Sequence, residues 1–242
     1  NGEIKVLQPN VNGFCLGVVD TPISGLPVSN HDHSVQGLEW TLAGELLIAV
    51  GGFTNQGANV NGIKLGGLDE TPLSGAYLIA DVRKPGFDGA VTYNATTNER
   101  YSVQTGGFDV KTYAVGLRNS YDGTLHTNGN LYATDNGPNG GFGDQALGCD
   151  ASGPAKGTKD ELLLLTPGSY HGHPNRNRAR TDPRQCNYFK PSAPASPGYT
   201  PTLADLKKSS MNGVVEYLGN HWCGALKHDL LISKFTGQNS AG

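Results

Sequence analysis

Short hydrophobic runs recur along the whole chain and stop at turn residues, mainly Gly, Asn, Asp and Pro. The runs span residues 37–52, 75–84, 89–94, 112–119, 129–137, 160–168, 211–219 and 228–237. This punctuation is typical of β-strands joined by hairpin turns. Residues 202–210 alone have the pattern of a helical turn, and the absence of a long amphipathic segment disfavours alternating strands and helices. The pattern predicts an all-β fold.

Short strands at regular spacing are compatible with a sandwich, a barrel or a propeller. A unit of one hydrophobic strand, a Gly-containing turn and a second hydrophobic run occurs at residues 37–50 and again, more loosely, at 123–134. This repetition favours a β-propeller of four-stranded blades. We expect a single propeller domain over residues 1–242 that is incomplete at both ends, because the sequence starts and stops abruptly.

Composition restricts the possible partners. The 242 residues include 35 Gly and 14 Pro, which suits a chain with many tight turns. The net charge of −3 provides no basic surface for nucleic acid. The longest apolar runs have the length of strands and fall short of the roughly 18 residues that a membrane-spanning helix needs. We therefore expect neither a nucleic-acid partner nor a membrane span.

Two segments lack a β pattern: residues 139–159 are rich in Gly, and residues 174–201 are rich in Pro, Arg and Asn. The four cysteines are Cys15, Cys149, Cys186 and Cys223. Because Cys149 and Cys186 lie in these two loops, we predict a disulfide between them. The other two cysteines form a second pair or remain free thiols. No C-x-x-C motif occurs, so a metal cluster is not expected.

The even number of cysteines is consistent with an oxidising compartment. Residues 94–96 read Asn-Ala-Thr, which is an acceptor sequence for N-glycosylation. Together with the low Lys content, these features predict a secreted, extracellular glycoprotein.

Polar motifs follow the strands in a fixed order. The chain reads NHDHS at residues 30–34, GLRN at 116–119, DNGPN at 135–139 and DEL at 160–162. In this order they resemble the glucose/sorbosone dehydrogenase family, the soluble quinoprotein sugar dehydrogenases, over about residues 11–235. The resemblance implies a six-bladed propeller. At about 40–60 residues per blade, this chain would supply four or five blades.

The resemblance also implies catalytic roles. His33, preceded by Asp32, matches the base that takes the proton from a sugar C1 hydroxyl, and histidine suits this role near neutral pH. Arg118 matches the arginine over the quinone carbonyl that receives hydride, where it would stabilise developing negative charge. Asn119 matches a residue that contacts the cofactor.

The implied cofactors are pyrroloquinoline quinone and Ca²⁺. The backbone carbonyls of Gly137 and Pro138 would bind the Ca²⁺ ion, which would also act on the quinone as a Lewis acid. Asn136 stands where the soluble glucose dehydrogenases have Gln. Lys234 lies two residues from the position of a lysine that binds the cofactor, on the same strand face, and would replace it.

One departure from the family concerns the partner of His33. The soluble glucose dehydrogenases carry an acidic residue after the strand that follows the histidine, where residues 49–57 read AVGGFTNQG here. Asn55 or Asp32 would then have to orient the ring. A separate pair, His171 and His173, is spaced to project from one face of a strand and could bind a metal, although no third ligand is evident.

Two functions remain open. The first is an enzyme that oxidises a sugar C1 hydroxyl and passes electrons to an unidentified acceptor. The alternative is a non-catalytic extracellular propeller, comparable to the hedgehog-interacting proteins, that serves as a protein-binding, glycan-binding or structural module. His33, Arg118, Asn119 and the Gly-Pro step favour the enzyme. The missing acidic residue and the displaced Lys234 favour the alternative.

Overall fold

The computed structural model describes residues 1–9, 13, 16–29, 33–55, 70–94, 103–139, 158–174 and 198–235. The strands are β1 (Gly2–Pro9), β2 (Leu16–Leu26), β3 (Val35–Trp40), β4 (Leu46–Val50), β5 (Ala76–Ala80), β6 (Thr92–Tyr93), β7 (Gln104–Gly106), β8 (Lys111–Val115), β9 (Ser120–Leu125), β10 (Leu131–Asp135), β11 (Asp160–Leu165), β12 (Ala204–Leu206), β13 (Met211–Glu216) and β14 (Leu230–Lys234). A short 3₁₀ helix covers Trp222–Gly224. The predicted all-β class is confirmed.

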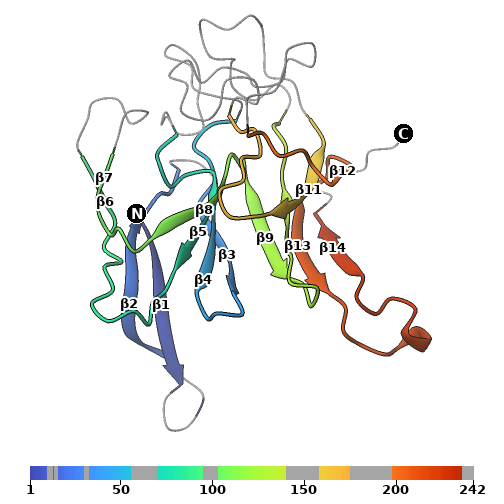
Figure 1. The fold of residues 1–242 in the computed structure, drawn as a ribbon, viewed down its shortest axis with the longest axis horizontal. Coiled ribbons are helices and arrows are strands. Elements are labelled where there is room, and N and C mark those ends of the chain that lie inside the picture. Colours follow the sequence, from blue (N-terminus) through green and yellow to red (C-terminus); the bar gives the residue numbers. More distant parts are fainter. Residues whose placement is uncertain are drawn as a thin grey trace, which may run out of the picture.

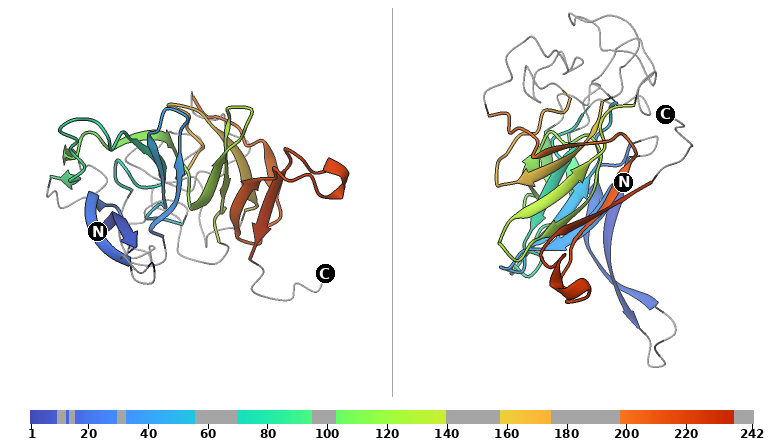
Figure 2. Two further views of the ribbon diagram at one scale, coloured as in Figure 1. Left: turned by 90° about the horizontal axis from the view of Figure 1, so that it is seen from below. Right: turned by 90° about the vertical axis from the view of Figure 1, so that its right-hand side faces the viewer.

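Two sheets have four antiparallel strands each, in the orders β3-β4-β5-β8 and β12-β11-β10-β9, and the pairs β1-β2, β6-β7 and β13-β14 form two-stranded sheets. The two four-stranded sheets and the β13-β14 pair stand side by side in the order of the sequence, whereas the β6-β7 pair lies at the outer edge near β1-β2 (Figures 1 and 2). Strand β9 packs against β3 on one side and β13 on the other. The leading strands of successive sheets are therefore neighbours, as in propeller blades, and the predicted four-stranded blades are confirmed.

One local prediction is wrong. The helical pattern at residues 202–210 gives no helix; it contains β12, which pairs antiparallel with β11, with Leu206 opposite Asp160 and Ala204 opposite Leu162. Pairing with the open edge of β11 outweighs the local helical preference, as tertiary contacts often do for short segments.

Strand β4 is buried on both faces, which explains its continuous run of apolar residues. Leu46, Ile48 and Val50 pack in a core shared with β2 and β5. Leu47 and Ala49 point the opposite way, into a second core with residues of β10 and β11. Burying each leucine or isoleucine contributes about 1.5–3 kcal/mol. The end of β4, and the loop that follows it, are thereby fixed relative to both four-stranded sheets.

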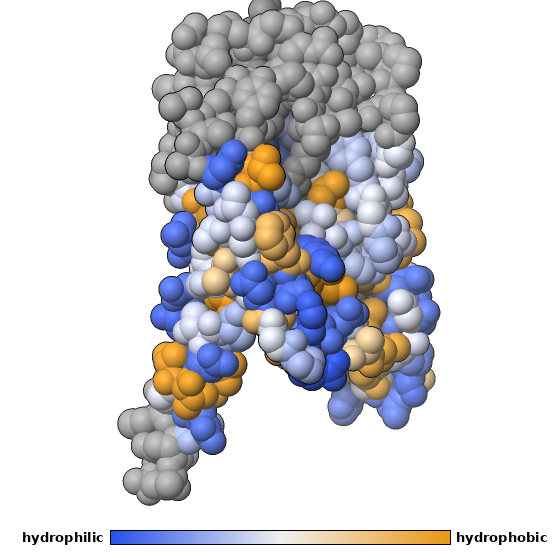
Figure 3. Space-filling view, turned by 60° about the vertical axis from the view of Figure 1, so that its left-hand side comes forward, coloured by the Kyte–Doolittle hydropathy of each residue, from blue (hydrophilic) through white to orange (hydrophobic). Residues whose placement is uncertain are grey.

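The β1-β2 hairpin projects from the body and carries exposed apolar side chains. Val6, Leu7, Val18 and Val19 are all exposed, and Figure 3 shows hydrophobic surface along this hairpin.

In the part of the chain that the structure describes, no helix has the length and apolar character to cross a membrane.

The cysteine and glycosylation predictions fall largely outside the described residues. Cys15, Cys149 and Cys186 lie outside them, and so do most of both long loops. Cys223 is an exposed free thiol. Asn94, at the start of the acceptor sequence, is exposed, and its side-chain oxygen accepts a hydrogen bond of 2.8 Å from the Val103 amide.

Candidate functional site

A group of buried polar residues lies at one end of the two four-stranded sheets, where β4, β8 and β10 end. We call it the polar cluster. Its members are His33, Gly52, Asn55, Arg118, Asn119, Asp135, Asn136 and Gly137. Residues of three motifs belong to this cluster, and Asp160 of the fourth accepts the Gly137 amide at 3.1 Å. They meet because these segments lie at the same end of neighbouring sheets.

Arg118 is the buried cation of the polar cluster, with 3% of its surface exposed. Its Nε and Nη2 donate to Asn55 Oδ1 at 3.2 and 2.9 Å, and its Nη1 donates to the Asn136 carbonyl at 3.1 Å. Asn55 is itself held by Asn139, through reciprocal hydrogen bonds of 2.9 Å. The guanidinium group therefore joins the loops that follow β4, β8 and β10. Asn55 was predicted from the sequence to orient His33, whereas here it contacts Arg118.

Asp135 fixes the loop that carries Arg118. Its two carboxylate oxygens accept the backbone amides of Arg118 and Asn119, at 2.9 and 2.7 Å. Burial raises the pKa of Asp135, and these two hydrogen bonds and the charge of Arg118 oppose that shift. The Asn119 side chain accepts a hydrogen bond from Gln36 on β3. Asp135 lay within a motif of the sequence, but its structural role was not predicted.

Asn136 presents a buried polar atom without a hydrogen-bond partner among the described residues. Its Nδ2 donates to Asn212 Oδ1 at 3.1 Å and lies 3.4 Å from Ser210 Oγ. Its Oδ1 is buried and, within the described part of the chain, accepts no hydrogen bond. A buried acceptor without a donor is unfavourable, which suits a position that contacts a ligand.

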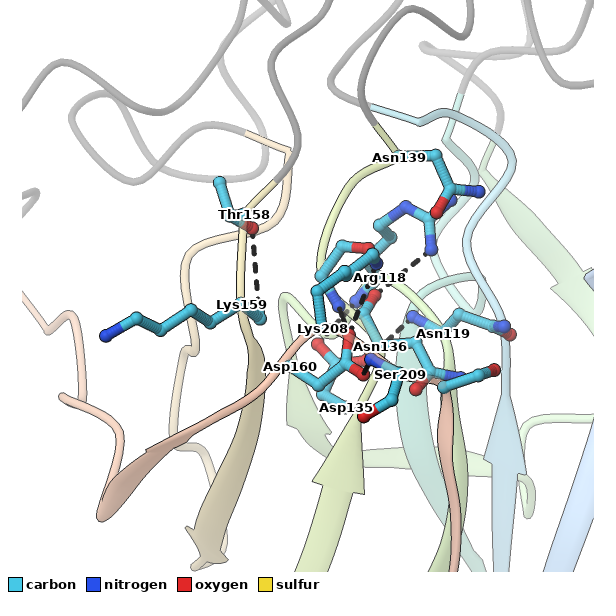
Figure 4. Close-up of polar contacts among 12 residues, drawn as sticks. Arg118, Asn119, Asp135, Asn136, Asn139, Thr158, Lys159, Asp160, Lys208 and Ser209 are labelled. Carbon is cyan, nitrogen blue, oxygen red and sulfur yellow. Dashed lines mark hydrogen bonds and ion pairs between the residues drawn. The ribbon is translucent and has the colours of Figure 1, made fainter. Parts of the chain in front are cut away.

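The turn after Asn136 is filled by a lysine. The Gly137 carbonyl accepts a hydrogen bond from the Lys208 ammonium group, which also contacts Asp160 Oδ1 at 3.2 Å. The Gly137 amide donates to the same Asp160 oxygen at 3.1 Å, and the Pro138 carbonyl accepts the Thr158 amide at 3.1 Å. Figure 4 shows Lys208 directed toward this turn and Asp160. Sequence reasoning missed Lys208, because it lies in a segment with a helical pattern.

His33 has a defined orientation. The residue is buried, its Nδ1 lies 2.7 Å from the Gly52 carbonyl oxygen, and its amide donates to Ser29 Oγ at 3.0 Å. Because a carbonyl only accepts, Nδ1 carries the proton, and the neutral ring keeps a lone pair on Nε2. The Gly52 carbonyl therefore holds Nδ1 of the ring, a role that the sequence analysis gave to Asn55 or Asp32. Asp32 lies outside the described residues.

A carboxylate does reach this loop, but from further along the chain. Glu70 accepts the Phe53 and Thr54 amides at 3.0 Å, and its Oε1 lies 2.7 Å from His173 Nε2. A side chain at Gly52 would come within 3.0 Å of both Glu70 and His173, so glycine leaves room for this pair. Glu70 had no recognisable motif and could not be assigned from the sequence.

The remaining candidates are dispersed. His171 Nε2 lies 2.9 Å from Ser169 Oγ, whereas His173 Nε2 contacts Glu70, so the two histidines have separate partners. Burial lowers the pKa of His171 to about 4. No three His, Cys, Asp or Glu side chains of the described segments are grouped to hold a metal. Lys234 is exposed at the end of β14, opposite Met211. Its predicted cofactor contact stays a prediction.

The polar cluster fits an organic anion better than a metal ion. Arg118 and Lys208 bring two cationic side chains to adjoining loops. A Ca²⁺ ion on the Gly137 carbonyl would instead lie next to the Lys208 ammonium group. The residues at this turn therefore do not fit a bound Ca²⁺ ion.

These features define a β-propeller-like protein with a buried Arg-His site at the ends of its strands. Scans against protein families and against curated proteins find no match. One similar solved structure is named glucose dehydrogenase, with a TM-score of 0.56, 18% identity, and coverage of 96% of this chain and 56% of that chain. Another is described as a crystal structure of glucose dehydrogenase, with a TM-score of 0.52, 18% identity, and coverage of 96% and 61%.

This likeness shows the fold. The chain spans between 56% and 61% of the length of the two glucose dehydrogenase structures. The similarity agrees with the fold that the sequence motifs predicted, while the activity of this chain rests on its own residues.

Proposed function

We propose that this chain is a sugar dehydrogenase that uses pyrroloquinoline quinone to oxidise a sugar C1 hydroxyl. One observation carries the proposal: Gly52 links the side chain of the candidate base to the backbone of the residue that carries the candidate cation. Its carbonyl lies 2.7 Å from His33 Nδ1, and its amide donates to the Arg118 carbonyl at 2.7 Å. A proton acceptor and a cation are thus held in one buried framework.

The protein groups have distinct tasks in this reaction. His33 Nε2 takes the proton of the C1 hydroxyl as the C1–O bond becomes a carbonyl. The quinone, when bound, accepts the hydride that leaves C1. Arg118 supplies positive charge where negative charge develops, and its three hydrogen-bonded partner atoms keep it in place without reorganisation. The product is the lactone of the sugar.

Two lines of support favour this function. The similar solved structures carry the name glucose dehydrogenase, and the GLRN and DNGPN motifs resemble those of the quinoprotein sugar dehydrogenases. The exposed Asn94 in a glycosylation sequence supports the further proposal that the protein is secreted.

The test separates binding from chemistry. Pyrroloquinoline quinone is titrated into the intact protein and followed by its absorbance, and sugar oxidation is measured with an artificial acceptor. Arg118→Gln should weaken cofactor binding by about 10–100-fold, the usual worth of a hydrogen bond to a charged group. His33→Gln should retain binding and lose oxidation. Lys111→Ala, an exposed change on β8, is the control and should alter neither.

One observation favours the alternative, a non-catalytic propeller that binds a protein or glycan. Within the described residues, Glu70 accepts amides of the loop after β4 and contacts His173, whereas His33 Nδ1 contacts the Gly52 carbonyl. Absence of quinone uptake at micromolar concentration would decide for this alternative.

A further inference from the structure

Backbone and carboxylate oxygens converge on one ammonium group in the turn after β10. Lys208 Nζ contacts the Gly137 carbonyl and Asp160 Oδ1. Asp160 is completely buried, and its oxygens also accept the amides of Gly137 at 3.1 Å and Ser209 at 2.9 Å. Carbonyl and carboxylate oxygens are the ligands that Ca²⁺ prefers. The turn thus has the character of a cation site whose cation is a side chain.

We propose that Lys208 is the built-in cation of this turn and replaces a divalent metal there. The ammonium group neutralises the buried Asp160 carboxylate and engages the Gly137 carbonyl. The Pro138 carbonyl is engaged by the Thr158 amide at 3.1 Å. A divalent ion placed on these carbonyls would lie beside the positive charge of Lys208, which already neutralises Asp160.

The consequence is a site that is independent of calcium. Arg118 Nη1 donates to the Asn136 carbonyl and Lys208 contacts the carbonyl of the next residue, so the two cations bind adjacent peptide units. An anionic cofactor would therefore meet two protein cations in place of one protein cation and one metal ion. This consequence rests on the proposed function, whereas the replacement of the metal by Lys208 is a property of the protein itself.

The first measurement is calorimetric titration of CaCl₂ into the intact wild-type protein after treatment with chelator, without any quinone. We expect no stoichiometric binding, and a melting temperature that is the same with millimolar Ca²⁺ and with chelator. Calcium binding by the wild-type protein that Asp160→Asn abolishes would place the metal at this turn and overturn the inference.

The second measurement compares two adjacent lysines. Lys208→Met keeps the apolar stem and leaves the buried Asp160 without its cation, so we expect the melting temperature to fall by roughly 2–4 °C. Lys207→Met removes an exposed neighbour and should leave it unchanged. Equal melting of the two variants would overturn the role of Lys208. If Lys208→Met does not fold, the wild-type titration decides alone.

The outcome is separable from that of the proposed function, because neither measurement contains quinone. A protein that binds neither calcium nor pyrroloquinoline quinone would fail the proposed function and keep the inference. A protein that binds calcium at Asp160 and also binds the quinone would support the proposed function and overturn the inference about Lys208.

Discussion

At the scale of single residues, the carboxylate of Asp135 holds the candidate site together through backbone atoms. It is buried and accepts the consecutive amides of Arg118 and Asn119. Buried amides that lose their acceptor are costly, because nothing else satisfies them away from water. The position of Arg118 therefore depends on a residue that need not touch a substrate.

Substituting Asp135→Asn should destabilise the protein. The amide group of asparagine turns a donor toward one of the two backbone N–H groups, which loses one hydrogen bond and leaves that N–H unsatisfied. We expect a loss of about 1–3 kcal/mol in the free energy of unfolding, measured with urea. Asp205→Asn, at an exposed ion pair with Lys159, should cost little and serves as the control. Equal effects would contradict the role of Asp135.

His171 gives a pH dependence with a defined sign. Burial lowers its pKa from 6.5 to about 4 in the folded protein. The unfolded chain therefore takes up a proton more readily, so the stabilisation is complete above pH 6.5 and is lost as the pH falls toward 4. Unfolding free energies should decline by at most about 1.4 kcal/mol per pH unit in this window. In His171→Gln this part of the decline should be absent.

At the scale of elements, two glycines let the loop after β8 pass close to its neighbours. The Gly75 carbonyl accepts the amides of Gly116 and Leu117, at 3.0 and 3.1 Å. Gly75 has a φ of 54°, and a Cβ there would lie 2.5 Å from the Leu117 carbonyl oxygen. The close approach of the two loops, and with it the start of the GLRN segment, requires the absence of a side chain.

Gly75→Ala should therefore loosen the candidate site as well as the fold. The clash is with backbone and cannot be relieved by a flexible side chain, so we expect a loss of more than about 2 kcal/mol in unfolding free energy. Gly86→Ala is a matched control, because that glycine also has a positive φ but faces open space. Similar losses in both variants would attribute the effect to φ alone.

The hydrophobic pattern of the sequence predicted those strands that are buried, because burial requires apolar residues at regular positions. The runs that became β4, β5, β10 and β11 are continuous or alternating because one or both faces are buried. The β1-β2 hairpin was missed, because most of its residues are exposed and impose no such pattern. The edge strand β12 was taken for a helical turn, since its pairing depends on a partner distant in sequence.

The residues of the candidate site that lie in motifs next to predicted strands could be identified from the sequence. His33, Arg118, Asn119 and Asn136 were all chosen from motifs, and the structure brings them into one cluster. Lys208 and Glu70 were not, because they reach the same loops from segments without a motif. Long-range pairing of this kind leaves no local signal in a single sequence.

At the scale of the whole molecule, Glu216 joins two sheets at the opposite end from the polar cluster. It lies on β13, and its carboxylate accepts the Thr127 amide at 2.7 Å and the Thr127 hydroxyl at 2.6 Å, in the turn between β9 and β10. His228 Nδ1, just before β14, lies 2.7 Å from the same carboxylate. Neighbouring sheets are thus connected by a polar clamp in addition to the apolar core.

Acid should weaken this clamp. Desolvation opposes ionisation of Glu216, but the hydrogen bonds from Thr127 and His228 outweigh it and lower the pKa from 4.5 to about 2. Its stabilising contribution is therefore complete above pH 4.5 and is lost as the pH falls toward 2. Denaturation curves across this window should shift less in Glu216→Gln than in the wild type. An unchanged shift would assign acid sensitivity to other groups.

The link through Gly52 has a consequence for how this protein can diverge. The Gly52 carbonyl contacts the His33 ring, and the Gly52 amide contacts the Arg118 carbonyl. Gly52 has no side chain, and its surroundings leave no room for one. Point substitutions at this position cannot retune the relation between the two groups without displacing Glu70 and His173. Natural variants and designed libraries would have to change the length of the loop to reach a new relation.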